Sequence, residues 1–248
     1  MALVLALFLM NCTVLAGGMP LPVPVVRDEA GGQALAEQIR CSMPEQSFER
    51  HGVFVITSGK NKTEIPFLCQ VKLQEGSWET VYQTEGTPAA GAESLVIIHR
   101  TNGPNQYLYA RAAKPGAPLP EPSPISPADM EAPFAGTDFS LGDLGMEFLH
   151  WPGQCRLQSE MRSGQSCYVL ESTNSRPGGI MRVRSSIDEK SLGPIRVEAY
   201  DSGGTEIKMF SLDSMQKDAH GQYQVKEMGI ENKKTRSHTD VKFAMPKD

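Results

Sequence analysis

The sequence has no cluster of four or more lysines and arginines, and its formal net charge is −5. A nucleic-acid-binding chain needs a basic patch or stripe to meet the phosphate backbone. The nearest approaches to one, "KNK" at 60–62 and "NKKTR" at 232–236, are typical of charged hairpin tips. We therefore expect no nucleic-acid partner.

The sequence also lacks the common signatures of catalysis. It has no G-x-S-x-G, no H-E-x-x-H and no G-x-x-x-x-G-K-[ST] motif. The five histidines are scattered singly and no two cysteines stand two to four residues apart, so the spacing predicts no metal site. Asp188 and Glu198 could form a carboxylate pair in space, but unrelated surface acids are far commoner. We expect no catalytic residue and no cofactor.

The first sixteen residues are almost wholly apolar and are followed by small residues and prolines. This pattern is typical of a secretory signal peptide over 1–18 with a Val14-x-Ala16 cleavage site. The apolar run is short for a membrane span, and Pro20 stops a helix directly after it. Cys12 offers the alternative of a lipid anchor, although Asn11 stands before it where a small residue is expected. The pattern predicts an exported protein.

Removal of the signal peptide leaves four cysteines in an exported chain, where disulfides can persist. One interpretation joins Cys155 to Cys167 across a short loop and Cys41 to Cys69. The other makes Cys69 and Cys167 buried thiols, because "FLCQVKL" and "SCYVLES" resemble core strands. The sequence does not choose between the two.

The pattern of most of the remaining chain predicts short strands. Residues 27–40 carry apolar side chains at helical spacing behind a candidate cap, Asp28, and predict one amphipathic helix. Beyond them the apolar residues recur at every second position, in segments separated by turn residues. The gaps are too short for crossover helices, so we expect about a dozen antiparallel strands in a mainly β (α+β) fold.

Residues 114–133 interrupt this pattern with seven prolines in twenty positions. Such a segment forms neither a regular helix nor a central strand. It is either a linker between domains or an extended segment that crosses one domain. The composition, which is neither Gly/Ser-rich nor strongly charged, favours an extended segment within a single domain at 19–248.

The predicted sheet has one apolar and one polar face. In "CRLQSEMR" the alternation places Leu157 and Met161 on one side and Glu160 on the other, and near the C-terminus Val241 and Phe243 share a side. The apolar face needs a cover, and a sheet that wraps around its few helices would supply one.

Residues 134–145, "FAGTDFSLGDLG", are the most distinctive loop. Phe134 and Phe139 are apolar anchors, and Ser140 followed by Asp143 three positions later resembles a capping box. The stretch therefore predicts a loop that holds one short helix, rather than a catalytic loop.

Three segments in this order resemble the outer membrane lipoprotein-sorting protein family, the LolA-like and LolB-like exported proteins. They are the 134–145 loop, the "CYVLE" strand at 167–171 and the hairpin "PIRVEAYDSGGTEIK" at 194–208. The loop carries the first motif of the family through Gly136, Asp138, Phe139, Ser140, Asp143 and Leu144. Similarity extends over roughly 30–245.

The resemblance implies an incomplete antiparallel β-barrel wrapped around a few helices and enclosing an apolar cavity. It implies a non-enzymatic periplasmic carrier of lipid or lipoprotein acyl chains in outer membrane biogenesis, a monomer that meets an envelope receptor protein. The alternatives are a regulator that recognises a protein or envelope lipid, and an enzyme with polar groups in its cavity. The candidate cavity residues are Leu157, Met161, Val169, Val197, Met209, Val241 and Phe243, with Met228 and Met245 as further flexible thioethers. All of these could equally be ordinary core residues.

Overall fold

A computed structural model describes residues 27–87, 90–101, 103–175, 178–217 and 223–244. The expected signal peptide at 1–18, with Cys12, and the candidate Met245 lie outside the described residues.

The described residues form one thirteen-stranded antiparallel sheet, ordered β6-β5-β4-β3-β2-β1-β13-β12-β11-β10-β9-β8-β7. The sheet is open, because β6 and β7 are its two edges. This confirms the predicted mainly β class. The strands are β1 (Phe48–Ser58), β2 (Asn61–Gln74), β3 (Ser77–Thr84), β4 (Glu93–Arg100), β5 (Gln106–Arg111), β6 (Ser123–Pro124), β7 (Gly153–Arg162), β8 (Gln165–Thr173), β9 (Arg182–Asp188), β10 (Pro194–Tyr200), β11 (Glu206–Lys217), β12 (Tyr223–Asn232) and β13 (Ser237–Phe243).

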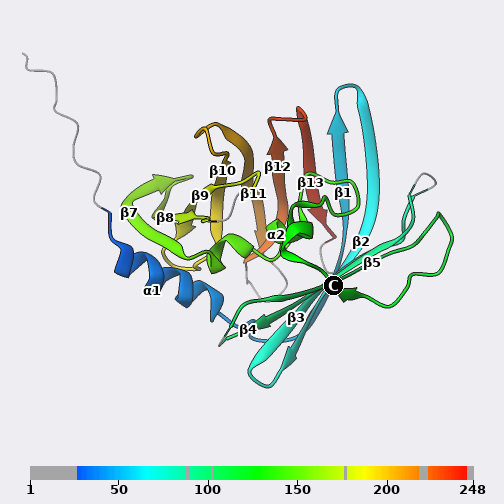
Figure 1. Ribbon diagram of the computed structural model, residues 1–248, viewed down its shortest axis with the longest axis horizontal. Helices are drawn as coiled ribbons and strands as arrows, with labels where there is room; N and C mark the ends of the chain where they lie inside the picture. Colours follow the sequence, from blue (N-terminus) through cyan, green and yellow to red (C-terminus); the bar gives the residue numbers. More distant parts are fainter. Residues whose placement is uncertain (1–26, 88–89, 102, 176–177, 218–222, 245–248) are drawn as a thin grey trace, which may run out of the picture.

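Two meanders make up this sheet, and they meet where β1 pairs with β13. Strands β1 to β6 form one arm and β7 to β13 the other (Figure 1). The proline-rich segment contributes the two-residue strand β6, which pairs with β5 at the edge of the first arm. The chain then crosses between the arms before β7 begins.

Four short helices accompany the sheet among the described residues: α1 (Glu29–Arg40), the 3₁₀ helices η1 (Pro127–Glu131) and η2 (Glu147–His150), and α2 (Leu141–Leu144). Helix α1 is the one predicted at 27–40, and Asp28 caps it by accepting a hydrogen bond from the Gly31 amide at 2.8 Å. It packs against β7 and β8, whereas α2 lies between the two arms (Figure 1).

The core consists of two clusters of buried side chains. One belongs mainly to the first arm and gathers around Phe54, Phe67, Leu95 and the loop residue Phe134. The other joins α1 and η2 to β8, β9 and β10 through residues such as Leu35 and Leu170. The segment between the arms therefore supplies side chains to both clusters and closes the inner face of the sheet.

One feature of β7 differs from the predicted alternation. Leu157 pairs with Val169 and Glu160 pairs with Cys167, with a register shift between them. Val169 and Cys167 are two residues apart on β8 and face the same way, so Leu157 and Glu160 share a face as well. The expectation that Leu157 and Glu160 oppose each other was wrong, because a β-bulge inserts an extra residue.

In the described part of the chain, no helix is both long enough and apolar enough to cross a bilayer.

Candidate binding cavity

A cavity of about 880 Å³ lies between the inner face of β9 to β12 and the segment around α2 and η2. Strand alternation explains its wall, because Ile195, Val197 and Ala199 occupy every second position of β10 and all line it. Apolar side chains dominate the lining. The others include Phe139, Leu144, Met146, Phe148, Val183, Phe210, Leu212, Val225, Met228 and Ile230.

One ion pair lies within this mostly apolar lining. The Lys208 ammonium on β11 donates to Asp143 Oδ2 at 2.9 Å, and the exposed fractions of the two side chains are 16% and 23%. Asp143 also accepts a hydrogen bond from the Ser140 amide at 2.8 Å and completes the capping box predicted for α2. Two motifs far apart in the sequence, the 134–145 loop and the 194–208 hairpin, therefore meet in the cavity.

The cavity opens at one end of the sheet. Antiparallel neighbours alternate in direction, so the β7–β8, β9–β10 and β11–β12 turns share an end. Met215 and Tyr223 line the cavity at this end and are 42% and 65% exposed. Lys208 lies towards the opposite end, where it pairs with Asn232 of β12. The opening therefore has exposed apolar side chains at its rim and the ion pair far from it.

Buried carboxylates fix the loop that covers the cavity. Glu93 on β4 is 2% exposed and accepts hydrogen bonds from the Ala135 amide at 2.7 Å and from the Tyr109 hydroxyl at 2.8 Å. The loop also bonds to the other arm: the Asp138 carboxylate accepts a hydrogen bond from the Thr239 hydroxyl of β13 at 2.8 Å, and the Asp138 amide donates to the same hydroxyl at 3.0 Å. The loop is thus bonded to both arms, and this places Phe139 and α2 over the cavity.

The residues proposed from the sequence as cavity lining fall in different places. Val197 lines the cavity. Met209 alternates with Lys208 and Phe210, both lining residues, and so faces away from it. The remaining five lie outside the lining: Val169 and Val241 are buried, Leu157 pairs with Val169 in the ladder, Met161 is 67% exposed, and Phe243 contacts the core of the first arm.

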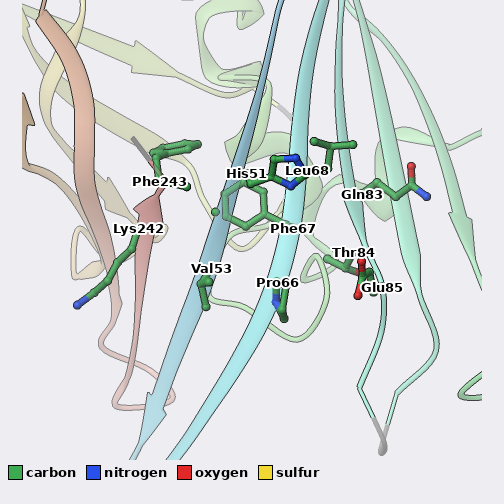
Figure 2. Close-up of a pocket in the computed structure, with 12 residues that line it drawn as sticks. His51, Val53, Pro66, Phe67, Leu68, Gln83, Thr84, Glu85, Lys242 and Phe243 are labelled. Atoms are coloured by element: carbon green, nitrogen blue, oxygen red, sulfur yellow. The ribbon is translucent and has the colours of Figure 1, made fainter. Parts of the chain in front are cut away.

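Phe243 lines a second, smaller pocket of about 590 Å³ near the end of β13 (Figure 2). Two rings line it, Phe67 and Phe243, which meet edge-on at 5.6 Å between centroids, and Phe67 also stacks on the core ring of Phe54 at 4.2 Å. These rings belong to the core cluster of the first arm, and the rest of the lining includes polar side chains such as His51 and Gln83 (Figure 2). The larger, more apolar cavity is therefore the stronger candidate for a binding site.

The four described cysteines are free thiols, three of them buried and Cys41 exposed. Cys155 pairs with Glu171, four residues from Cys167 along β8, which is too far for a disulfide between them. Burial raises the pKa of Cys69 to about 11, so this thiol stays protonated at neutral pH. The structure agrees with the buried-thiol interpretation of Cys69 and Cys167.

Two histidines outside the cavity, His99 and His150, have strongly lowered pKa values. Burial lowers the pKa of His99, which stacks on Trp78 at 4.7 Å between centroids, to about 4. It lowers the pKa of His150, at the end of η2, to about 4 as well. Both rings are neutral at neutral pH. In the described residues, no group of three or more His, Cys, Asp and Glu side chains is placed to hold a metal ion.

A protein-family model with the description "uncharacterized protein" matches residues 77–247. The chain belongs to this family. The comparison with curated proteins gave no match.

Three solved structures are similar to the structure of this chain. A protein domain from Vibrio parahaemolyticus, described as outer membrane lipoprotein-sorting, is similar with a TM-score of 0.70 and 16% identity, over 88% of this chain and 92% of that one. A DUF1329 family protein from Desulfovibrio piger has a TM-score of 0.69 with the same identity and coverage. A LolA superfamily protein from Nitrosomonas europaea has a TM-score of 0.55 at 16% identity, over 89% and 94% of the two chains. The chain therefore has the LolA-like fold that the sequence resemblance implied.

Proposed function

We propose that this protein is an exported, non-enzymatic carrier that binds the acyl chain of a lipid or lipoprotein in the cavity beneath β9 to β12. The observation that carries the proposal is the cavity itself: about 880 Å³, walled mainly by apolar side chains, with exposed lining residues at the end where β11 turns into β12. Such a volume is in the range of small-molecule sites in proteins. The fold, shared with a protein described as lipoprotein-sorting, supports the same function.

Hydrocarbon transfer needs no catalytic group. Each methylene moved from water into an apolar site gains about 0.8 kcal/mol, so ten methylenes supply about 8 kcal/mol before the cost of ordering the chain. The described lining contains neither histidine nor cysteine, and the ammonium of Lys208 is paired with Asp143. These features favour binding over an enzymatic role.

The open end supports a path for the ligand. Met215 and Tyr223 present apolar surface at the rim, and the Lys217 ammonium lies 5.0 Å from the Tyr223 ring centroid. An aromatic ring beside a lysine is a combination suited to the boundary between water and lipid. We propose that acyl chains enter and leave at this end, and that residues 1–18 direct the protein out of the cytoplasm to the periplasm as a signal peptide.

The test measures binding of N-phenylnaphthylamine, an uncharged hydrophobic fluorophore, by fluorescence titration. Val197→Phe fills part of the cavity, and we expect it to weaken binding about tenfold, because about two methylene equivalents of contact are lost. Met209→Phe makes a similar enlargement on the opposite face of the neighbouring strand and should bind as the wild type does. Circular dichroism checks that both variants are folded.

Equal binding by Val197→Phe, Met209→Phe and the wild type would contradict the cavity as the site. The absence of any binding by the wild-type protein would contradict the carrier function.

A further inference from the structure

The charged groups of the cavity restrict the ligand further than its apolar walls do. The lining includes four residues of acidic or basic type: Asp143, Asp188, Asp213 and Lys208. Three of them are carboxylates, and the one ammonium is paired with Asp143. The lining therefore offers no surplus positive charge to a ligand.

The positions of these groups matter as much as their number. Asp188 lies at the β9–β10 turn, at the open end of the cavity. Asp213 accepts a hydrogen bond from the Ser211 hydroxyl at 2.7 Å, and because Ser211 alternates with the lining residue Phe210, this carboxylate faces away from the cavity. An anionic ligand would therefore meet, inside the cavity, one cation that Asp143 already neutralises. In a site of low effective dielectric constant, an added unpaired negative charge is strongly disfavoured.

The ion pair nevertheless has hydrogen-bonding capacity to spare. An ammonium has three N–H donors, and among the described residues Lys208 has one partner, Asp143. Both hydrogen bonds that Asp143 accepts go to Oδ2, from Lys208 and Ser140, so Oδ1 can still accept one. A donor and an acceptor thus lie side by side with no net charge.

The distance along the strand gives the ligand its shape. Lys208 and Met215 both line the cavity and are seven residues apart on β11, which corresponds to about 20 Å of strand. Between them lie Phe210 and Leu212, whose apolar side chains also line the cavity. A polar group at Lys208 and an extended hydrocarbon chain directed towards Met215 would fill this space.

We propose that the cavity takes an electroneutral acyl ester in preference to the anion of a free fatty acid. The ester carbonyl accepts a hydrogen bond from Lys208, and a hydroxyl or amide of the same ligand donates to Asp143. This inference rests on the proposed carrier function. The same chemistry occurs in a free acylglycerol and in the diacylglyceryl group of a lipoprotein.

The experiment is isothermal titration calorimetry with monopalmitoylglycerol and with palmitate, each below its critical micelle concentration. The pH of the solution is well above the pKa of a carboxylic acid, so that palmitate is an anion. These two ligands share an acyl chain and differ in charge. We expect the wild-type protein to bind the ester at least about tenfold more tightly. Palmitate binding as tightly as the ester, or more tightly, would overturn the inference and leave the carrier function standing, whereas binding of neither would overturn both.

Asp143→Asn is the decisive variant. The asparagine carbonyl still accepts the Ser140 amide, so the cap of α2 is kept, but Lys208 loses its counter-charge. We expect palmitate to gain about tenfold in affinity while the ester changes less. Unchanged palmitate affinity would contradict the role of the pair.

The matched control is Glu206→Gln. Glu206 lies on β11, as Lys208 does, but outside the cavity lining, and it forms an ion pair with Lys233, which follows β12. Its substitution removes one carboxylate from the protein, as Asp143→Asn does, and should leave the preference for the ester unchanged. A gain in palmitate affinity equal to that of Asp143→Asn would show that overall charge is responsible and would overturn the inference.

A diacylglyceryl-modified cysteine peptide distinguishes the two sources of the ester. Tighter binding of the peptide than of monopalmitoylglycerol supports the inference with a lipoprotein as the cargo, and the reverse order supports it with a free lipid. Weaker binding of both than of palmitate overturns it.

Discussion

Replacing Asp138 by alanine should destabilise the protein more than a typical surface substitution does. Asp138 is 8% exposed, and its carboxylate accepts hydrogen bonds from the hydroxyls of Ser237 and Thr239 on β13. A hydrogen bond to a charged group contributes about 1.5–3 kcal/mol. Because Thr239 is fully buried, its hydroxyl cannot turn to water instead. We expect a loss of about 3 kcal/mol in the free energy of unfolding.

The measurement is urea denaturation followed by circular dichroism. Asp240→Ala is the control, because this carboxylate is on the same strand but its side chain is 34% exposed and, among the described residues, bonds to His238 alone, two positions earlier. Its loss should cost less than about 1 kcal/mol. Asp138→Ala should also weaken binding of the hydrophobic fluorophore, because the loop that places Phe139 over the cavity loses the two hydrogen bonds between this carboxylate and β13. A cost below about 1 kcal/mol for Asp138→Ala would refute the argument that this carboxylate holds the loop.

Three further predictions concern buried positions. His99 has a pKa of about 4 in the folded protein and about 6.5 in the unfolded chain, so the unfolded state binds more protons between these two pH values. The free energy of unfolding therefore falls as the pH drops through this window, by up to about 3 kcal/mol. His99→Gln should reduce this dependence in denaturation measured across pH, and an unchanged dependence would contradict the prediction. Gly52→Ala should cost about 1–3 kcal/mol, since its Cβ would lie 2.5 Å from the Phe67 ring, whereas Gly103→Ala, with open space around it, should change the melting temperature little. Gly32→Ala should destabilise the protein despite the higher helix propensity of alanine, because its Cβ would lie 2.5 Å from the Cys155 Cα and push α1 away from β7; a raised melting temperature would refute this packing.

Local signals carried much of the fold. The antiparallel strands, the helix capped by Asp28 and the capping box of Ser140 and Asp143 depend on neighbours within a few residues, and the structure confirms all three. The pairing of β1 with β13 joins the two ends of the described chain and has no local signal. It follows from the need to bury the apolar faces of both arms together.

The cavity was harder to foresee than the sheet. Alternation identifies which residues share a face, but not which face is concave: Met209 is a lining candidate by sequence, whereas its neighbours Lys208 and Phe210 line the cavity. Bulges add to this difficulty, as at Leu157 on β7, because one extra residue exchanges the faces beyond it. By sequence, Lys208 is only the last residue of the 194–208 motif, because its position inside the cavity depends on contact with Asp143, 65 residues earlier in the chain.

Native mass spectrometry of the protein purified from a bacterial envelope without detergent tests the carrier function most directly. We expect a mass increment that dissociates as an acyl ester or acylated peptide, present in the wild type and in Met209→Phe and diminished in Val197→Phe. An apoprotein mass that stays unchanged after incubation with monopalmitoylglycerol and with the diacylglyceryl peptide would contradict it.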